Sequence, residues 1–164
     1  MFTVQKIIEK RKEHNLPLFL LFIDYEKAYD NVNRDKLWEV MDNKISKYLL
    51  NTMKCIYRNT NIRIKFNGGV SGPTHINKGV RQGCGLSPVL FNIYFNKIIQ
   101  EFKRAMKGIQ LNNKKSVNTI LYAVEQILLA TSEDELQTMA HHLNLIARKY
   151  KMTISSTKTK SMAM

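Results

Sequence analysis

The stretch LFLLFID, which spans Leu18–Asp24, decides the first element of the fold. Pro17 precedes this run, which is apolar at every position until it ends in the carboxylate of Asp24. A strand that is apolar on both faces is typical of a central position in a sheet, where other elements cover each side. The sequence therefore predicts a buried central strand over residues 18–23 with a carboxylate at its end.

Four helices are predicted from cap residues that precede apolar side chains at helical spacing. The caps are Asn33, Ser46, Ser87 and Ser132. The apolar stripe of the first helix extends to Ile45, and that of the third runs from Phe91 to Ala105. The side chains expected to point inward from the second helix are Leu49, Met53, Ile56 and Tyr57.

Extended segments are predicted before, between and after these helices. An Asn-Gly turn at Asn67 separates alternating segments at 61–66 and 70–76, which predicts a hairpin. Residues 120–123 and 127–130 predict a tighter hairpin joined at 124–126, and residues 153–162 predict a last strand. This order of elements predicts an α+β fold with a split β-α-β, ferredoxin-like core. Ferredoxin-like RNA-binding modules and polymerase palms are both compatible with it.

Composition limits the class of protein. The chain has 164 residues, of which 44% are apolar, and this fits a single globular domain over residues 1–164. Two cysteines exclude a disulfide framework and a four-cysteine zinc site. The apolar run at 18–23 is too short to span a bilayer, and charged residues interrupt the N-terminal segment. We therefore expect an intracellular, soluble protein without a membrane partner.

The charge balance favours an anionic partner. Lys and Arg number 26 against 13 for Asp and Glu, so the formal net charge is +13. Nucleic acid is the leading candidate, because cations that neutralise phosphates release counterions. A membrane surface is a rival interpretation, but no helix combines a Lys-rich face with a broad apolar face. A third interpretation is a solvated Lys-rich surface without a partner.

Three segments together narrow the function. They read FIDYEKAYD at Phe22–Asp30, KGVRQGCGLSPVLFN at Lys78–Asn92 and LYAVEQILLA at Leu121–Ala130. In order and spacing the chain resembles the reverse transcriptase domain of non-LTR (LINE-type) retrotransposons, and these segments match its palm motifs A, B and C. Residues 152–162 resemble motif D, and residues 2–10 resemble the end of the fingers. The resemblance implies a polymerase palm with part of the fingers, and no thumb or endonuclease within residues 1–164.

The first segment places Asp24 at the end of a strand. Carboxylates in such positions hold two metal ions about 3.5–4 Å apart in two-metal sites. The resemblance implies that Asp24 is a ligand of Mg²⁺ or Mn²⁺ and that Tyr29 lies beneath the sugar of an incoming deoxynucleotide. The alternatives are a helix cap for Asp24 and a core aromatic for Tyr29.

The second segment is a glycine-rich loop that ends at a helix N-terminus. Glycines let the backbone approach a ligand closely, and a helix N-terminus favours an anion. The resemblance implies that Gln82 and Gly83 contact the incoming nucleotide and that Arg81 faces phosphate. We interpret Cys84 as a small packing residue rather than a reactive thiol.

The third segment departs from the family pattern at the metal site. Where the family has two aspartates after Tyr-Ala, this chain has Val124 and Glu125. Valine offers no oxygen ligand, and the longer glutamate side chain shifts its carboxylate, whereas Mg²⁺ requires near-ideal octahedral geometry. We therefore expect a degenerate site formed by Asp24 and Glu125, with weak or lost metal binding and negligible activity.

The motif D segment keeps Lys158 but has Ser155 in place of the usual Asn. The resemblance implies that Lys158 is catalytic in an active relative, where it protonates the leaving pyrophosphate. The alternative is a phosphate-facing or solvated lysine.

Two hypotheses of function follow. The first is a fragment of an RNA-directed DNA polymerase, a nucleotidyltransferase that adds deoxynucleotides by two-metal catalysis in the family but is inactive here. The second is a non-catalytic module whose basic cleft binds an RNA template, a DNA primer or a hybrid duplex. A decaying element copy without a selected role is a third interpretation.

Overall fold

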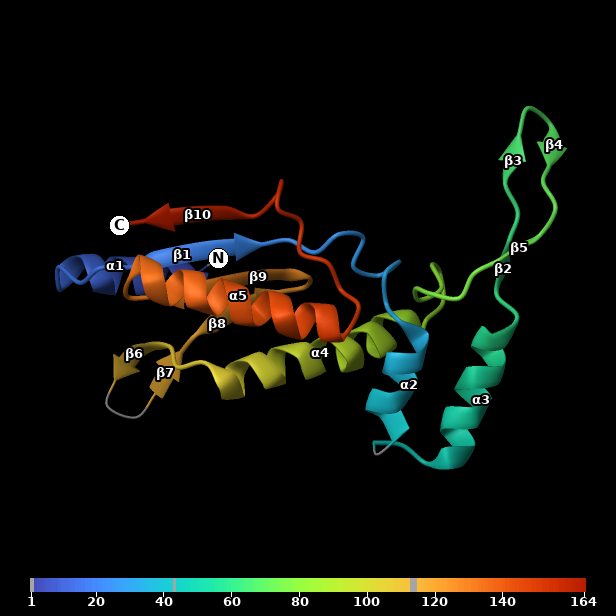
Figure 1. The fold of residues 1–164 in the computed structure, drawn as a ribbon, viewed down its shortest axis with the longest axis horizontal. Helices are drawn as coiled ribbons and strands as arrows, with labels where there is room; N and C mark the ends of the chain where they lie inside the picture. The colour runs from blue at the N-terminus through green and yellow to red at the C-terminus, as the bar shows by residue number, and fades with distance from the viewer. Residues whose placement is uncertain (1, 43, 113–114) are drawn as a thin grey trace. The chain divides into compact units, whose positions relative to one another are not determined.

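The computed structural model describes residues 2–42, 44–112 and 115–164, and Figure 1 shows the order of their helices and strands. The chain forms two compact units. We call them the sheet unit, built from the segments before Tyr29 and after Lys97, and the loop unit, residues 29–97. Within the described ranges, no helix is long and apolar enough to cross a membrane.

A four-stranded antiparallel sheet forms the centre of the sheet unit. Its strands, in chain order, are β1 (Phe19–Ile23), β8 (Thr119–Tyr122), β9 (Glu125–Ala130) and β10 (Lys160–Ala163). Their order across the sheet is β10-β1-β9-β8. β1 therefore has a strand on each side, which confirms the central strand predicted from its apolar run.

Helices cover both faces of this sheet. Val4 and Ile7 of α1 (Phe2–Glu13) pack in one apolar cluster with Leu20 of β1 and Leu129 of β9. α5 (Glu133–Lys149) packs on β1 and β9, and residues that alternate with this cluster along each strand point to the other face. The side chains that α5 and its C-cap bury are Leu136, Met139, Leu143, Ile146, Ala147 and Tyr150.

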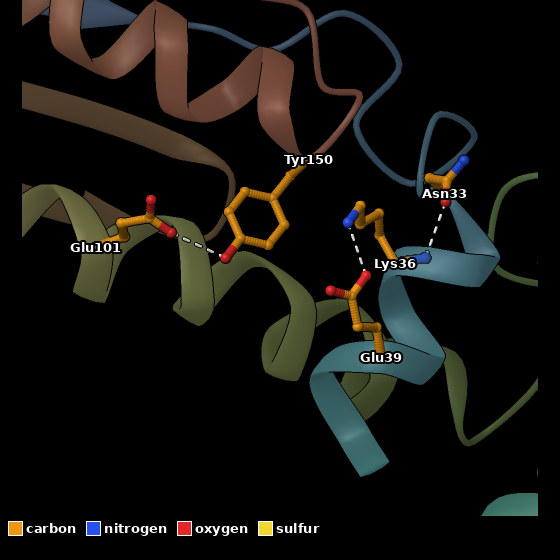
Figure 2. Close-up of polar contacts among 5 residues, drawn as sticks. All are labelled: Asn33, Lys36, Glu39, Glu101 and Tyr150. Carbon is orange, nitrogen blue, oxygen red and sulfur yellow. Dashed lines mark hydrogen bonds and ion pairs between the residues drawn. The ribbon is translucent and has the colours of Figure 1, made fainter. Parts of the chain in front are cut away.

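Polar contacts fix the two ends of α5. Ser132 caps the helix, because its side chain accepts a hydrogen bond from the backbone N–H of Glu135. At the other end Tyr150 donates its hydroxyl to Glu101 at 2.9 Å, as Figure 2 shows. Glu101 belongs to α4 (Ser87–Ala105), and the contact therefore joins the two longest helices.

One hairpin of the sheet unit was not predicted. β6 (Ile109–Asn112) and β7 (Lys115–Val117) pair directly after α4. Gly108 marks its start, because a Cβ at this position would overlap the backbone of Val117. Gly108, Asn112 and Asn113 were turn signals in this segment, but such residues do not distinguish a hairpin from a loop.

The loop unit begins with α2 (Arg34–Asp42) and α3 (Lys47–Arg58), and both predicted caps are present. Asn33 accepts from the backbone N–H of Lys36 at 2.9 Å, which Figure 2 also shows, and Ser46 accepts from that of Leu49 at 3.3 Å. α2 ends at Asp42, so Ile45 lies beyond the helix to which we assigned it.

The inward face of α3 differs from the prediction. Leu50 and Tyr57 are buried, whereas Leu49 and Ile56 are exposed. α3 packs against α2 along one seam, and residues seven positions apart suffice to line such a seam. The sequence is apolar around more of the helix than the fold buries, and the pattern alone therefore could not identify the buried stripe.

A thin hairpin follows α3, and we call residues 61–76 the arm. Its strands are β2 (Asn61–Ile62), β3 (Lys65–Phe66), β4 (Gly69–Val70) and β5 (Thr74–His75). The predicted turn is confirmed, with a left-handed backbone at Asn67 and Gly68. The two continuous strands that we predicted are wrong, because β2 pairs only with β5 and β3 only with β4. Pro73 lacks an N–H for the ladder between them.

The aromatic helix α4 begins at Ser87, which we predicted as the cap before the helix, and the Ser87 hydroxyl donates to Arg81 O. Its buried side chains include Phe91, Tyr94, Phe95, Ile98 and Phe102, but Ala105 is exposed. α4 begins in the loop unit and ends in the sheet unit.

Candidate functional site

The two predicted metal-site carboxylates lie at the same end of the sheet. β1 and β9 pair in antiparallel register, in which Ile23 is opposite Gln126. Asp24 follows Ile23 and Glu125 precedes Gln126 in the sequence, so each carboxylate adjoins this last pair of the register. The two residues expected to hold the metal thus adjoin the same end of this strand pair, and their joint role stays a prediction.

The turn before Glu125 is tighter than we predicted. Tyr122 pairs with Glu125, so Ala123 and Val124 alone connect β8 and β9, and Glu125 belongs to β9. Ala123 has a φ of 53°, in the left-handed region. Two-residue hairpins favour such backbone because its twist matches that of the strands. Val124 thus occupies the turn next to the two carboxylates and adds no oxygen to them.

A cationic partner for Asp24 comes from the C-terminal segment. Lys158 Nζ lies 3.3 Å from Asp24 Oδ2, with the lysine side chain 72% exposed and the aspartate side chain 29% exposed. The backbone N–H of Ser155 donates to Asp24 O at 2.8 Å, which fixes the two segments beside each other. Lys158 therefore lies beside Asp24 at this end of the sheet.

The last strand is shorter than the predicted 153–162. β10 covers Lys160–Ala163, and Ile154 forms only an isolated bridge with Tyr25. Between them, Thr159 bonds back to Ser155 O through both its N–H and its hydroxyl, which interrupts the extended backbone. This interruption lies next to Lys158.

A buried polar chain supports the register at this end of the sheet. Tyr25 donates its hydroxyl to Gln126 Oε1 at 2.8 Å, and Gln126 donates to Thr119 Oγ1 at 3.1 Å. Burial raises the pKa of Tyr25 well above its ordinary value, so the phenol stays a donor. Sequence reasoning missed these residues, although a glutamine inside an apolar strand was a usable signal.

The side chains at this end of the sheet do not suit a divalent cation. Across residues 2–42, 44–112 and 115–164, no three His, Cys, Asp or Glu side chains gather closely enough to hold a metal ion. Mg²⁺ takes oxygen ligands in strict octahedral geometry. Asp24 is already paired with the ammonium group of Lys158, and the side chain of Val124 in the turn has no oxygen to offer a metal ion.

The predicted nucleotide-site residues lie in the loop unit. Val80 N–H donates to Tyr29 O at 3.0 Å and Gly79 N–H donates to Val32 O at 2.8 Å, so the segment after Tyr29 runs beside the glycine-rich loop. The Tyr29 ring stacks on Phe91, with centroids 4.1 Å apart, and one face stays accessible because the residue is 41% exposed.

The other three predicted residues, Arg81, Gln82 and Gly83, are exposed on the loop itself. Arg81 is held at both ends, since its side chain donates to Ile56 O and its carbonyl accepts the hydroxyl of Ser87. Ser87 thus fastens the loop to the start of α4. The loop is presented to solvent from a fixed base.

Gly79 is required by its surroundings. Its φ is +79°, and a Cβ would lie 2.8 Å from the carbonyl oxygen of Asp30. Gly83 also has a positive φ, +75°, but no atom lies within 4 Å of its Cβ position. The first glycine therefore serves the packing of the loop, whereas the second leaves open space above the backbone.

Arg34 is the residue of this region that sequence reasoning missed. It is 8% exposed, and its guanidinium donates to three carbonyls, those of Gly79 at 3.0 Å, Tyr57 at 3.1 Å and Ile76 at 2.7 Å. The guanidinium carbon also lies 5.0 Å from the Tyr57 ring centroid. Burial lowers the pKa of Arg34, but a guanidinium remains charged in proteins. A basic residue in a first helical turn, where acids are favoured, was the available signal.

Cys84 has a feature that a packing role does not explain. Its pKa is lowered, chiefly because the backbone N–H of Leu86 forms a hydrogen bond with the sulfur. Cys84 is only partly buried.

Comparison with known proteins indicates the same family as the motifs. A family model described as reverse transcriptase (RNA-dependent DNA polymerase) matches residues 2–163. The chain is 24% identical over 140 residues to the transposon TX1 uncharacterized 149 kDa protein of Xenopus laevis, covering 84% of this chain and 11% of that protein. It is 23% identical over 134 residues to a retrovirus-related Pol polyprotein from the type-1 retrotransposable element R2 of Popillia japonica, covering 79% and 22%. The chain thus spans less than a quarter of the length of these relatives.

Solved structures share the fold. Telomerase from Candida tropicalis, in complex with a TWJ fragment of telomeric RNA, superposes with a TM-score of 0.69 at 18% identity, over 93% of this chain and 27% of that one. Telomerase from Candida albicans, with the same kind of RNA fragment, gives 0.66 at 14% identity, over 98% and 30%. At such identities the likeness concerns the fold alone, and it confirms the predicted α+β, polymerase-type class.

Proposed function

Because this chain belongs to the reverse transcriptase (RNA-dependent DNA polymerase) family, we propose that it is a palm that binds nucleic acid without polymerising deoxynucleotides. Its relatives from the TX1 and R2 elements agree with the non-LTR subgroup that the motifs indicated.

The loss of polymerase activity is supported by one observation, the ion pair between Lys158 and Asp24 in a chain whose β8–β9 turn contains Val124. Two-metal catalysis needs bridging carboxylates that are free to hold cations. Here the ammonium group of Lys158 supplies the positive charge at Asp24, and the residue before Glu125 is Val124 instead of an aspartate. Lys158 thus holds the Asp24 carboxylate instead of serving as the acid for a leaving pyrophosphate.

The net charge supports the proposal that the chain binds nucleic acid. A net charge of +13 provides the sequence-independent attraction that dominates nucleic-acid affinity. We include a single-stranded RNA template, a DNA primer and their hybrid duplex as partners. Tyr29, Arg81, Gln82 and Gly83 are assigned to deoxynucleotide contact, and the accessible face of Tyr29 and the exposed loop support that assignment.

Primer extension tests the loss of chemistry. The chain is incubated with an RNA template, a labelled DNA primer, deoxynucleotides and either Mg²⁺ or Mn²⁺, and we expect no extended product. A Val124→Asp, Glu125→Asp double variant, compared in a longer polypeptide of the element that includes this chain, restores the family's pair of aspartates and should gain incorporation. Template-dependent extension by the unmodified chain would overturn the proposal.

A metal titration tests the ion pair itself. Free Mn²⁺, followed by electron paramagnetic resonance, should decrease little when the unmodified chain is added. Adding Lys158→Met to the double variant removes the competing ammonium group and should tighten Mn²⁺ binding. Lys160→Met in the same background is the matched control, because it removes an equal charge from a nearby residue. Equal effects of the two lysine variants would show that general charge, rather than the Asp24 contact, governs the site.

Fluorescence anisotropy with a labelled hybrid duplex and a labelled single strand tests binding. We expect an affinity that falls steeply with salt and does not change when EDTA replaces Mg²⁺. Absence of binding at low salt, or binding that requires the metal, would contradict the proposal.

A further inference from the structure

Acidic residues are missing from a long part of this chain. No Asp or Glu occurs between Asp42 and Glu101, although 24% of all residues are charged. This interval contains α3, the arm and the glycine-rich loop, and all its charged side chains are Lys or Arg. The interval between Asp42 and Glu101 therefore carries only positive charge, and the arm lies inside this interval.

The arm also exposes apolar side chains that a small hairpin would normally bury. Phe66 is 74% exposed, and Ile62, Ile64 and Val70 are exposed as well. Phe66 is opposite Gly69 in the β3–β4 pair. Glycine has no side chain, so no cross-strand neighbour covers the ring, which cross-strand pairs usually do. In Figure 1 the β3–β4 pair forms the tip of the arm, beyond the β2–β5 pair.

Cations alternate with these apolar groups. Arg63 and Lys65 lie between Ile62, Ile64 and Phe66 in the sequence, and both are exposed. Aromatic rings interleaved with cations are the combination that binds single-stranded nucleic acid, because bases stack on the ring while phosphates pair with the cations. A second copy of the arm would bring like charges together. No acidic residue between Asp42 and Glu101 is available to offset them.

A cavity of about 830 Å³ lies at the base of the arm. Its lining includes Asn61 and His75 of the arm, together with Lys78, Arg81 and Gln82 of the glycine-rich loop. Asp30 is the one acidic lining residue, and Arg34 lines the same cavity. The cationic, partly apolar surface thus continues from the tip of the arm to the loop.

We propose that the arm is a binding site for single-stranded nucleic acid, with a base stacked on Phe66, phosphates paired with Arg63 and Lys65, and the strand continuing toward the cavity. The inference rests on the proposed function only in that the chain binds nucleic acid. It adds a location and a strand type, and it needs neither a metal ion nor the carboxylates of the sheet unit.

Alanine substitution tests the stacking contact. Phe66→Ala should weaken binding of a labelled 12-nucleotide RNA or DNA by about 5- to 100-fold, the range found for loss of one base–aromatic stack. Phe2→Ala is the matched control, because Phe2 is an equally exposed phenylalanine, at 73%, in the sheet unit. Phe66→Trp should keep the affinity, and its added fluorescence should be quenched by the oligonucleotide. If a saturating concentration of the oligonucleotide does not quench this added fluorescence, the proposed stacking on residue 66 is wrong.

Charge removal tests the phosphate contacts. Arg63→Gln with Lys65→Gln should reduce the slope of log affinity against log salt by about 1.4, since each single-strand phosphate contact contributes about 0.7. Lys10→Gln with Lys12→Gln, in α1, removes the same charge and should change the slope less. Running RNA and DNA strands in parallel shows whether the arm prefers one sugar.

The outcomes separate this inference from the proposed function. If the unmodified chain binds no oligonucleotide, both fail. If it binds but the Phe66 and Arg63/Lys65 variants behave as their α1 controls, the arm site is wrong and the proposed function stands. Concentration-dependent self-association that Phe66→Ala abolishes, with nucleic-acid binding unchanged, would identify a second copy as the occupant instead and would also overturn the inference.

Discussion

The sheet unit and the loop unit hold different parts of the candidate site. In the sheet unit, Asp24 follows β1 and Glu125 begins its partner strand β9, with Lys158 paired to Asp24 and Val124 in the turn. In the loop unit the glycine-rich loop exposes Arg81, Gln82 and Gly83, and a buried Arg34 holds its base. In each unit, buried hydrogen bonds hold the backbone beside the candidate-site residues.

The comparison shows that scaffold and chemistry depend on different residues. Val124 lies in the two-residue turn between β8 and β9 and is only partly buried. Arg34 and Gly79 lie where backbone segments meet, and most other side chains would leave a polar group unpaired or an overlap unresolved. Substitutions in the two units should accordingly have effects of different kinds.

The largest expected effect is that of Arg34→Met. It leaves three inward carbonyls without their charged donor, and we expect a loss of about 3–5 kcal/mol in the free energy of unfolding. Trp38 lies edge-on to Tyr57 at 5.6 Å, so its fluorescence during urea unfolding reports on the loop unit. Arg63→Met, on the exposed arm, is the control and should stay within about 0.5 kcal/mol. Equal losses would show that Arg34 does not hold the loop.

Next in size is the difference between two glycines of the same loop. Gly79→Ala combines left-handed strain with overlap on the Asp30 carbonyl, and we expect about 3 kcal/mol of destabilisation. Gly83→Ala has the strain without the overlap and should cost about 1 kcal/mol. Urea midpoints by Trp38 fluorescence measure both. If the two variants unfold at the same concentration, the Asp30 contact is not a constraint.

A pair of tyrosines compares the units directly. Tyr25→Phe removes the donor to buried Gln126 in the sheet unit, which should cost about 1–2 kcal/mol. Tyr29→Phe keeps the stacked ring in the loop unit and should change the free energy of unfolding by less than about 0.5 kcal/mol. Circular dichroism during urea unfolding measures each. A larger effect at Tyr29 would reverse the assignment of structural and ligand-facing roles.

The smallest effect concerns the thiol of Cys84. A lowered pKa means that its thiolate is stabilised in the folded state, so alkylation by iodoacetamide should rise at lower pH than for an ordinary thiol. The corresponding stability is present above the unfolded pKa and is lost as pH falls through the folded pKa. A Cys55→Ser variant isolates Cys84, and the shift should vanish in urea. An unshifted pH profile in the folded protein would show that the Leu86 N–H does not stabilise the thiolate.

Sequence patterns predicted those parts of the site that depend on local periodicity. The apolar run before Asp24 and the run after Glu125 predicted two strands, and antiparallel pairing then places their ends together. The caps Asn33, Ser46 and Ser132 were predictable because a cap bonds within its own helical turn.

Long-range contacts were not predictable in the same way. Arg34 bonds to backbone carbonyls, which every residue has, so no pattern marks its partners. Lys158 lies in a segment whose register with Asp24 depends on the break at Ser155 and Thr159, and the alternating pattern of 153–162 gave no sign of that break. The stripe of α3 was misassigned because burial on one narrow seam leaves apolar residues such as Leu49 and Ile56 outside.

The three acceptors of Arg34 also have a consequence for folding kinetics. They lie 23, 42 and 45 residues further along the chain, so the guanidinium cannot be satisfied until distant segments have met. Contacts of such separation form late on the folding path, because loop closure must precede them. Substitution of Arg34 should therefore accelerate unfolding more than it slows folding.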